Sequence, residues 1–112
     1  MTSLKHWILE GRQPVEVEMF VWARWFENVE NRVVMRTYDE DGGLLVSTVF
    51  LGIDHRFGGG GDPILWETCV FDAPDRDDHM RRYCSRLEAL EGHTEVVREI
   101  ANLLETKPCP TN

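Results

Sequence analysis

The stretch from residue 32 to residue 52 limits the fold more than any other part of the sequence. It holds two runs of β-branched and aromatic residues, RVVMRTY and LLVSTVFLG, separated by the turn-forming cluster DEDGG at 39–43. Such runs are enriched in strands, and Asp and Gly clustered between them are typical of a β-hairpin. We therefore expect two paired antiparallel strands, over 32–38 and 44–52.

Four further segments have the composition of strands. Residues 4–9 and 14–17 flank a turn-like EGRQ, which predicts a short hairpin at the start of the fold. Residues 64–71 (ILWETCVF) are apolar on both faces except near their centre, as expected of a central strand. Residues 80–84 (MRRYC) are expected to form an edge strand, whose arginines oppose mispairing with other chains.

Residues 18–31 (EMFVWARWFENVEN) are dense enough in apolar residues to fit either a strand or a helix. As a helix they place apolar residues at i, i+3, i+4 and i+7, which gives one apolar stripe with Glu18 in the first turn. We therefore predict a helix here. Its stripe consists of Met19, Trp22, Ala23 and Phe26.

The C-terminal part of the chain has the pattern of a long helix. Ser85 followed by Glu88 is a capping-box signature, and the helix is expected to run from there to about residue 105, before KPCP. One side of this helix should face the core. The residues predicted for that side follow steps of three and four: Leu90, His93, Val97, Ile100 and Leu104.

These elements predict an α+β fold. An antiparallel sheet of about four to six strands would pack against the C-terminal helix and a shorter helix in the N-terminal half of the chain. The 112 residues suffice for one hydrophobic core. We therefore expect a single domain over residues 1–105 and a short polar tail over 106–112.

The balance of charge limits the class of partner. Twelve basic side chains against twenty acidic ones give a formal net charge of -8, which opposes binding to phosphate backbones. A host or phage protein with a basic surface is the expected partner, and direct nucleic-acid binding is not expected. The acidic stretches are either solvated turns or binding residues. The candidates are Asp39, Glu40, Asp41, Asp75, Asp77 and Asp78.

An aromatic cluster offers a second candidate for binding. Trp22, Trp25 and Phe26 lie in one short predicted helix, which would rarely bury all three rings. Most of them are expected in the core. One exposed ring, rimmed by Glu27 and Glu30, would make a binding anchor, and Trp22 and Trp25 are the candidates.

The sequence also predicts a compartment. Its three cysteines lack the paired spacing of a zinc site and are odd in number, which favours reduced thiols in a cytoplasm. The first residues contain no apolar run long enough for a secretory signal, and no segment is long enough to span a bilayer. We expect a cytoplasmic protein in the host cell, with no membrane partner and no cofactor.

Three sequence segments also resemble a known family. VSTVFLGIDH (46–55), GGDPILWET (60–68) and RRYCSRLEALEGH (81–93) are similar to the pattern VSTVFLGxDH, FET and RYxTxxEAxxGH of small uncharacterised proteins from phages, prophages and bacteria. The resemblance implies a phage or mobile-element context and a compact α+β domain. It assigns no roles to the matching positions, which are Asp54, His55, Glu67, Thr68, Gly92 and His93.

Four of these positions carry side chains that could do chemistry. Asp54 and His55 lie where a strand becomes a loop, a common place for functional residues. The favoured interpretation is nevertheless structural: Asp54 caps a turn there and His55 donates to a backbone carbonyl. Glu67, if buried in its strand, must be paired or have a raised pKa. His93 on an apolar helix face is more often a satisfied core residue than a ligand.

These residues lead to three hypotheses about function. The leading one is a non-enzymatic phage-type accessory protein that binds another protein, as an acidic inhibitor of a host nucleic-acid-handling or defence system. The second is a small metal-dependent or acid-base enzyme, or a ligand-binding domain, in which Asp54, His55, Glu67 and His93 meet, with His55, Glu67 and His93 as candidate metal ligands. The third is a structural or assembly component of a phage particle.

Overall fold

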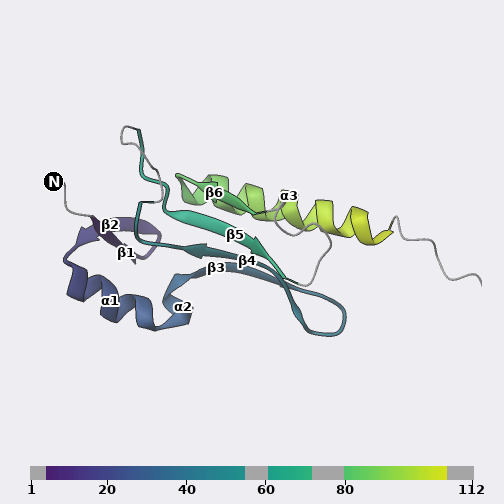
Figure 1. Cartoon of the computed structure of the whole chain (residues 1–112), viewed down its shortest axis with the longest axis horizontal. Helices are drawn as coiled ribbons and strands as arrows, with labels where there is room; N and C mark the ends of the chain where they lie inside the picture. The colour runs from purple at the N-terminus through teal and green to yellow at the C-terminus, as the bar shows by residue number, and fades with distance from the viewer. Residues whose placement is uncertain (1–4, 55–60, 72–79, 106–112) are drawn as a thin grey trace, which may run out of the picture.

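The computed structural model describes residues 5–54, 61–71 and 80–105, with the backbone alone for 103–105. Six strands and three helices follow one another in this part of the chain (Figure 1). None of these helices is both long enough and apolar enough to cross a lipid bilayer. In chain order the elements are β1 (His6–Glu10), β2 (Gln13–Val17), α1 (Met19–Glu27), α2 (Val29–Arg32), β3 (Val33–Tyr38), β4 (Leu44–Phe50), β5 (Trp66–Val70), β6 (Arg81–Tyr83) and α3 (Arg86–Glu105).

The central feature is a four-stranded antiparallel sheet in the order β3-β4-β5-β6, so each strand pairs with its neighbour in the sequence. β1 and β2 form a separate two-stranded antiparallel sheet. Both predicted hairpins are therefore present, and the MRRYC segment supplies the edge strand β6. Together with α3 and the shorter α1, these sheets confirm the predicted α+β fold.

The turn between β3 and β4 is held by Asp39. Its Oδ1 accepts hydrogen bonds from the backbone N–H groups of Asp41 and Gly43, each at 2.9 Å. Gly42 takes a positive φ of 85°, which glycine adopts without strain. Asp39 therefore serves the turn itself, whereas Glu40 and Asp41 present exposed side chains at its tip.

α3 runs lengthwise along the sheet and packs against one of its faces (Figure 1). Its fully buried side chains are Ala89, His93, Val96 and Ile100, whereas Leu90 and Val97 are only half-buried. The predicted stripe is therefore confirmed at His93 and Ile100 and in part at Val97, which packs half-buried against the core, and the side chain of Leu104 lies outside the described residues. The contact line is shifted by one residue because small residues at 89 and 92 let the start of the helix approach the sheet closely.

The start of α3 has the predicted capping box. The backbone N–H of Glu88 donates to Ser85 Oγ at 3.1 Å, and the Ser85 hydroxyl donates to Glu88 Oε1 at 3.0 Å. The first of these bonds satisfies a backbone N–H that the first turn of a helix leaves unpaired, and the second holds the two side chains together. Arg81 of β6 adds ion pairs to Glu95 and Glu99, and these tie the edge strand to the helix.

The predicted helix over 18–31 is broken into two. Asn28 has an extended conformation (φ -84°, ψ 107°), and its side chain accepts the N–H of Glu30 at 3.1 Å, so it ends α1 and caps α2. The predicted stripe is also wrong at Met19, which is exposed. Trp25 takes the inward position instead, beside Trp22 and Phe26.

The N-terminal hairpin docks where β4 ends, at Gly52. The N–H of Trp7 donates to the carbonyl oxygen of Gly52 at 2.8 Å. Gly52 has a φ of 75°, and a Cβ there would overlap the indole nitrogen of Trp22 and the carbonyl oxygen of Trp7. Glycine is therefore required at the point where VSTVFLG leaves the sheet.

Candidate functional site

His93 lies at the centre of a buried hydrogen-bonded chain between α3 and the sheet. Its side chain is only 1% exposed. Ring nitrogen Nε2 lies 2.8 Å from Thr37 Oγ1 on β3, and Nδ1 lies 2.8 Å from Thr48 Oγ1 on β4. Both nitrogens of the histidine are therefore occupied by hydroxyl groups of the sheet.

The row of hydrogen bonds continues across the remaining two strands, β5 and β6. Thr48 and Thr68 are direct cross-strand partners, and their hydroxyl oxygens lie 2.6 Å apart. The Tyr83 hydroxyl of β6 donates to Thr68 Oγ1 at 3.0 Å. Each of the four strands thus contributes one side chain to a single row of polar groups beneath α3.

Gly92 makes room for this row. A Cβ at Gly92 would overlap the hydroxyl and ring atoms of Tyr83, so a larger residue there would force helix and strand apart. Gly92 and His93 are neighbours in sequence and serve the same contact, one by its size and the other by its two nitrogens. The Gly-His pair of the C-terminal motif is therefore explained by packing.

One direction of hydrogen-bond donation satisfies every polar group in this row of side chains. Tyr83 donates to Thr68, Thr68 to Thr48, and Thr48 to Nδ1 of a neutral His93, whose Nε2–H then donates to Thr37. A charged ring would bring two donors and a buried charge. Burial lowers the pKa of His93 below its usual value of 6.5 and raises the pKa of Tyr83, so both are held neutral.

These hydrogen bonds join α3 to the sheet, and burial shields their central groups from a substrate. Thr48, Thr68 and His93 are buried, and only Thr37 at one end is half-buried. A general acid or base must reach the atom it serves within hydrogen-bonding distance. His93 is therefore a satisfied core residue, which was the simpler of its two predicted roles.

The other candidates of the predicted centre have separate roles. Asp54 Oδ1 accepts the backbone N–H of Ile64 at 2.8 Å, which closes the base of the intervening loop. His55 lies outside the described residues. Glu67 Oε2 pairs with Arg82 Nε at 2.8 Å across β5 and β6, and its Oε1 accepts from Cys69 Sγ at 3.1 Å.

Glu67 and His93 lie on opposite sides of the sheet. Residues alternate between the two faces of a strand, and the neighbouring Thr68 faces α3, so Glu67 projects from the other face. A single centre containing both residues does not form, which corrects that hypothesis. Among the described residues, no group of three or more His, Cys, Asp or Glu side chains is placed to hold a metal ion.

The aromatic residues of α1 are arranged differently from the prediction. Trp22 packs between His6 and Phe26, at ring-centroid distances of 5.1 and 4.6 Å, and Trp25 meets Phe50 edge-on at 5.8 Å. Both indoles are half-buried. The exposed ring belongs to Phe20, which is 79% exposed. An exposed ring therefore lies in the expected helix, but it is Phe20 rather than Trp22 or Trp25.

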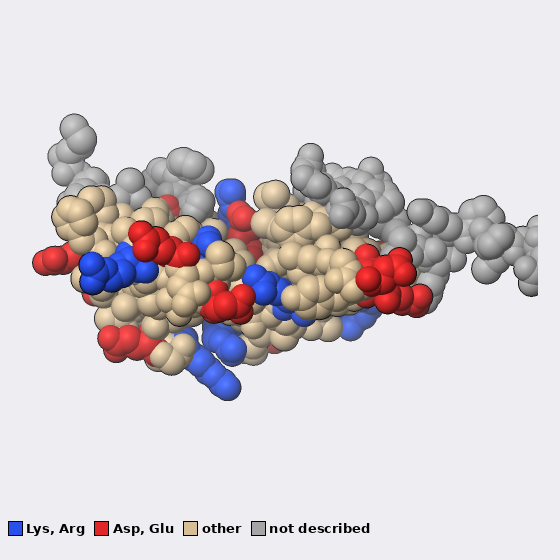
Figure 2. Space-filling view, turned by 90° about the horizontal axis from the view of Figure 1, so that it is seen from below, with Lys and Arg blue, Asp and Glu red and all other residues tan. Residues whose placement is uncertain are grey.

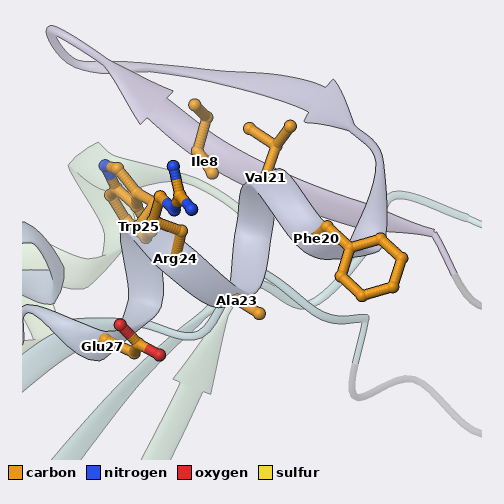
Figure 3. Close-up of a pocket in the computed structure, with 7 residues that line it drawn as sticks. All are labelled: Ile8, Phe20, Val21, Ala23, Arg24, Trp25 and Glu27. Carbon is orange, nitrogen blue, oxygen red and sulfur yellow. The ribbon is translucent and has the colours of Figure 1, made fainter.

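Phe20 borders a hollow between α1 and the N-terminal hairpin. The hollow has a volume of about 780 Å³, and Figure 3 shows Ile8 and Val21 beside each other on its hairpin side. In the same view Phe20 points away from the helix into open space. The lining residues are Ile8, Phe20, Val21, Ala23, Arg24, Trp25 and Glu27.

The acidic candidates fall into two groups. Asp39, Glu40 and Asp41 are exposed in the β3–β4 turn, with Asp39 also holding the turn by its hydrogen bonds. Figure 2 shows acidic side chains gathered at the end of the molecule where this turn lies in Figure 1. The remaining three, Asp75, Asp77 and Asp78, lie outside the described residues.

Sequence reasoning missed the hydroxyl groups that partner His93. The sequence did contain a signal for Thr48, because residues two apart in a strand share a face and Thr48 lies between Val46 and Phe50 on the inward face of β4. An inward threonine among apolar residues needs a hydrogen-bond partner. Thr37 and Tyr83 gave no such signal, since their strands could have faced either way.

Each described position of the resemblance motifs thus has an internal role. Asp54 closes a loop, Glu67 pairs two strands, and the Thr68, Gly92 and His93 positions form the contact between sheet and helix. Such roles maintain a fold and specify no activity. Comparison of the chain with protein-family models, with curated proteins and with solved structures finds no match.

Proposed function

We propose that this protein is a non-enzymatic phage-type accessory protein that acts in the cytoplasm of a host cell by binding a basic surface of another protein. The observation that carries the proposal is the segregation of charge along the chain. Residues 1–38 contain five basic and five acidic side chains, so the entire net charge of -8 belongs to residues 39–112.

The β3–β4 turn is the described part of this acidic region that is best placed for binding. Glu40 and Asp41 are exposed at its tip, and neither forms an ion pair with a residue that the structure describes. Concentrated charge of one sign speeds the encounter with a surface of opposite sign. A partner whose basic surface handles nucleic acid fits this charge, because carboxylates would compete there with phosphates.

The positions of the titratable groups favour binding over catalysis. His93 is enclosed and neutral, and Glu67 is engaged by Arg82 on the opposite face of the sheet. The exposed features are instead carboxylates at one end and an apolar helix at the other. Surfaces of this kind recognise macromolecules rather than enclose a small substrate.

The proposal can be tested by reversing charge at the tip of the turn. A Glu40→Lys/Asp41→Lys variant keeps Asp39 and its hydrogen bonds. Its matched control is Glu10→Lys/Glu16→Lys, which changes the net charge equally in the neutral region. Both variants and the unchanged protein would be used to capture partners from a bacterial lysate, with quantification by mass spectrometry.

We expect a stoichiometric partner that is captured by the unchanged protein and by the control but lost with the turn variant. Capture should also weaken as salt is raised, because exposed charges are screened. Equal capture by the two variants would contradict the proposed binding surface. The absence of any stoichiometric partner would remove the proposal.

A further inference from the structure

One face of α1 carries three exposed side chains and the half-buried Ala23, and no helix or strand among the described residues covers it. Phe20, Ala23, Arg24 and Glu27 follow one another at i, i+3, i+4 and i+7, so they share that face. None of the α1 side chains is fully buried, and Met19 and Val21 flank the face with 53% and 47% exposure. We call the four residues the α1 face.

We infer that the α1 face binds a second copy of the same chain, with the two α1 helices antiparallel about a twofold axis. Charge is the first argument. The face lies within residues 1–38, which carry no net charge, whereas the rest of the chain is strongly acidic. Two copies can meet at their neutral regions without the repulsion that their acidic regions would cause. This surface is separate from the acidic turn, so the inference does not depend on the proposed function.

The order of residues along the α1 face provides the second argument. In an antiparallel pair with its axis between Ala23 and Arg24, the small Ala23 lies at the centre and allows close approach. Arg24 of each copy then lies opposite Ala23 of the other and reaches along the helix to Glu27 of that copy, four positions or about 6 Å away, so two opposite-charge contacts form from one sequence. Within one chain, neither Arg24 nor Glu27 forms an ion pair with a described residue. Such self-complementarity is what a twofold interface requires.

The hollow beside the helix supplies the remaining contact. Phe20 of one copy lies opposite Glu27 of the other, which lines the same hollow as Ile8 and Trp25. An aromatic ring that fills an apolar hollow is a common anchor of protein interfaces. A stable interface buries about 800 Å² on each partner, more than a nine-residue helix offers. The N-terminal hairpin must therefore contribute, and a dimer of micromolar affinity is expected.

Sedimentation equilibrium of the full chain from about 1 to about 200 µM tests the inference, a range that covers micromolar dissociation constants. We expect a shift from monomer to dimer within this range. Phe20→Ala should weaken the dimer at least about tenfold, since a central aromatic anchor is removed. The control Leu87→Ala removes another exposed apolar side chain, 66% exposed, from α3 and should leave dimerisation unchanged.

Charge exchange tests the antiparallel arrangement itself. Arg24→Glu places acidic residues opposite each other, and Glu27→Arg places basic residues opposite each other, so each variant alone should be mainly monomeric. Mixed in equal amounts, the two variants should form a heterodimer, because both contacts again join opposite charges. The double variant Arg24→Glu/Glu27→Arg should recover the homodimer. Circular dichroism of each variant would show that α1 is retained.

Three results would overturn the inference. The first is a monomer throughout the concentration range. The second is a dimer that Phe20→Ala leaves intact, which would place the interface elsewhere. The third is mixed charge variants that stay monomeric while the unchanged chain dimerises, which would exclude the antiparallel pairing. None of these results affects partner capture by the acidic turn, so the proposed function is tested separately.

Discussion

The two longest helices, α3 and α1, are both amphipathic, yet they differ in how far their side chains are buried. α3 buries Ala89, His93, Val96 and Ile100 against the four strands, and both nitrogens of its one buried histidine have partners. α1 buries no side chain fully and leaves Phe20 79% exposed. The difference shows that apolar residues at helical spacing predict a helix face that packs against something, but do not predict which part of the protein, or which other molecule, packs there. For α3 it is the chain's own sheet.

Hydrogen bonding separates the two helices as clearly as burial does. The row from Tyr83 to Thr37 crosses all four strands and passes through His93, so sheet and helix can meet in only one register. Buried polar groups impose such uniqueness because any shift leaves donors without acceptors. α1 has no comparable row in the described structure and packs through its aromatic rings.

The largest effect is expected from Gly92→Val in α3. The added side chain would overlap the buried Tyr83, so we expect a loss of about 3 kcal/mol or more in the free energy of unfolding. Urea denaturation would measure it. Ala101→Val, at an exposed position of the same helix, should cost only about 0.5 kcal/mol. A near-normal stability for Gly92→Val would show that the helix does not approach β6 this closely.

The next effect is expected from Thr48→Val, which keeps the shape of the side chain and removes its hydroxyl. Thr68 and His93 each lose a partner while buried, so the expected loss is about 2 kcal/mol. Thr94→Val is the matched control, because the Thr94 hydroxyl is exposed and bonds only its own helix. If both variants cost the same, the buried row does not contribute specifically to stability.

The stability should also depend on pH through His93. Burial lowers its pKa in the folded protein, so the unfolded chain binds the proton more readily. Stability is then highest above the unfolded value of 6.5 and falls as the pH drops below it, by at most about 1.4 kcal/mol per pH unit for one proton. Denaturation between about pH 7.5 and 5.5 would measure this slope, and His93→Asn should flatten it. An unchanged slope in that variant would contradict the assignment.

The smallest effect on folding is expected from Phe20→Ala. Since this ring is 79% exposed, its removal from the monomer should change the free energy of unfolding by no more than about 0.5 kcal/mol. The measurement belongs at a protein concentration below the dimerisation range. A loss similar to that of Thr48→Val would mean that the two helices are not used differently after all.

Much of the fold could be predicted from local patterns. The hairpin over 33–50, the capping box at Ser85 and the edge strand β6 each depend on residues close together in sequence. The break at Asn28 was missed because apolar periodicity continues across it, whereas one polar cap is enough to end a helix. The stripe of α3 was predicted one residue away from its fully buried line at Ala89 and Val96, because Leu90 and Val97, which are only half-buried, are equally apolar.

The candidate site was harder to predict than the elements that carry it. His93 and Glu67 were recognised as groups that need explanation, and each has found a partner. Their separation follows from the alternation of β5, which turns Thr68 toward α3 and Glu67 away. Which of these two residues faces α3 depends on how the whole sheet packs, so it could not be predicted from a local sequence pattern.

The sequence by itself determined most of the secondary-structure elements, the fold class and the separation of a neutral first third from an acidic remainder. Those properties depend on side chains a few residues apart or on composition alone. Only the tertiary structure decided that Thr37, Thr48, Thr68 and Tyr83 meet His93, and that Phe20 rather than a tryptophan faces solvent. The physical reason is that these contacts join distant segments, whose meeting depends on the packing of every element at once.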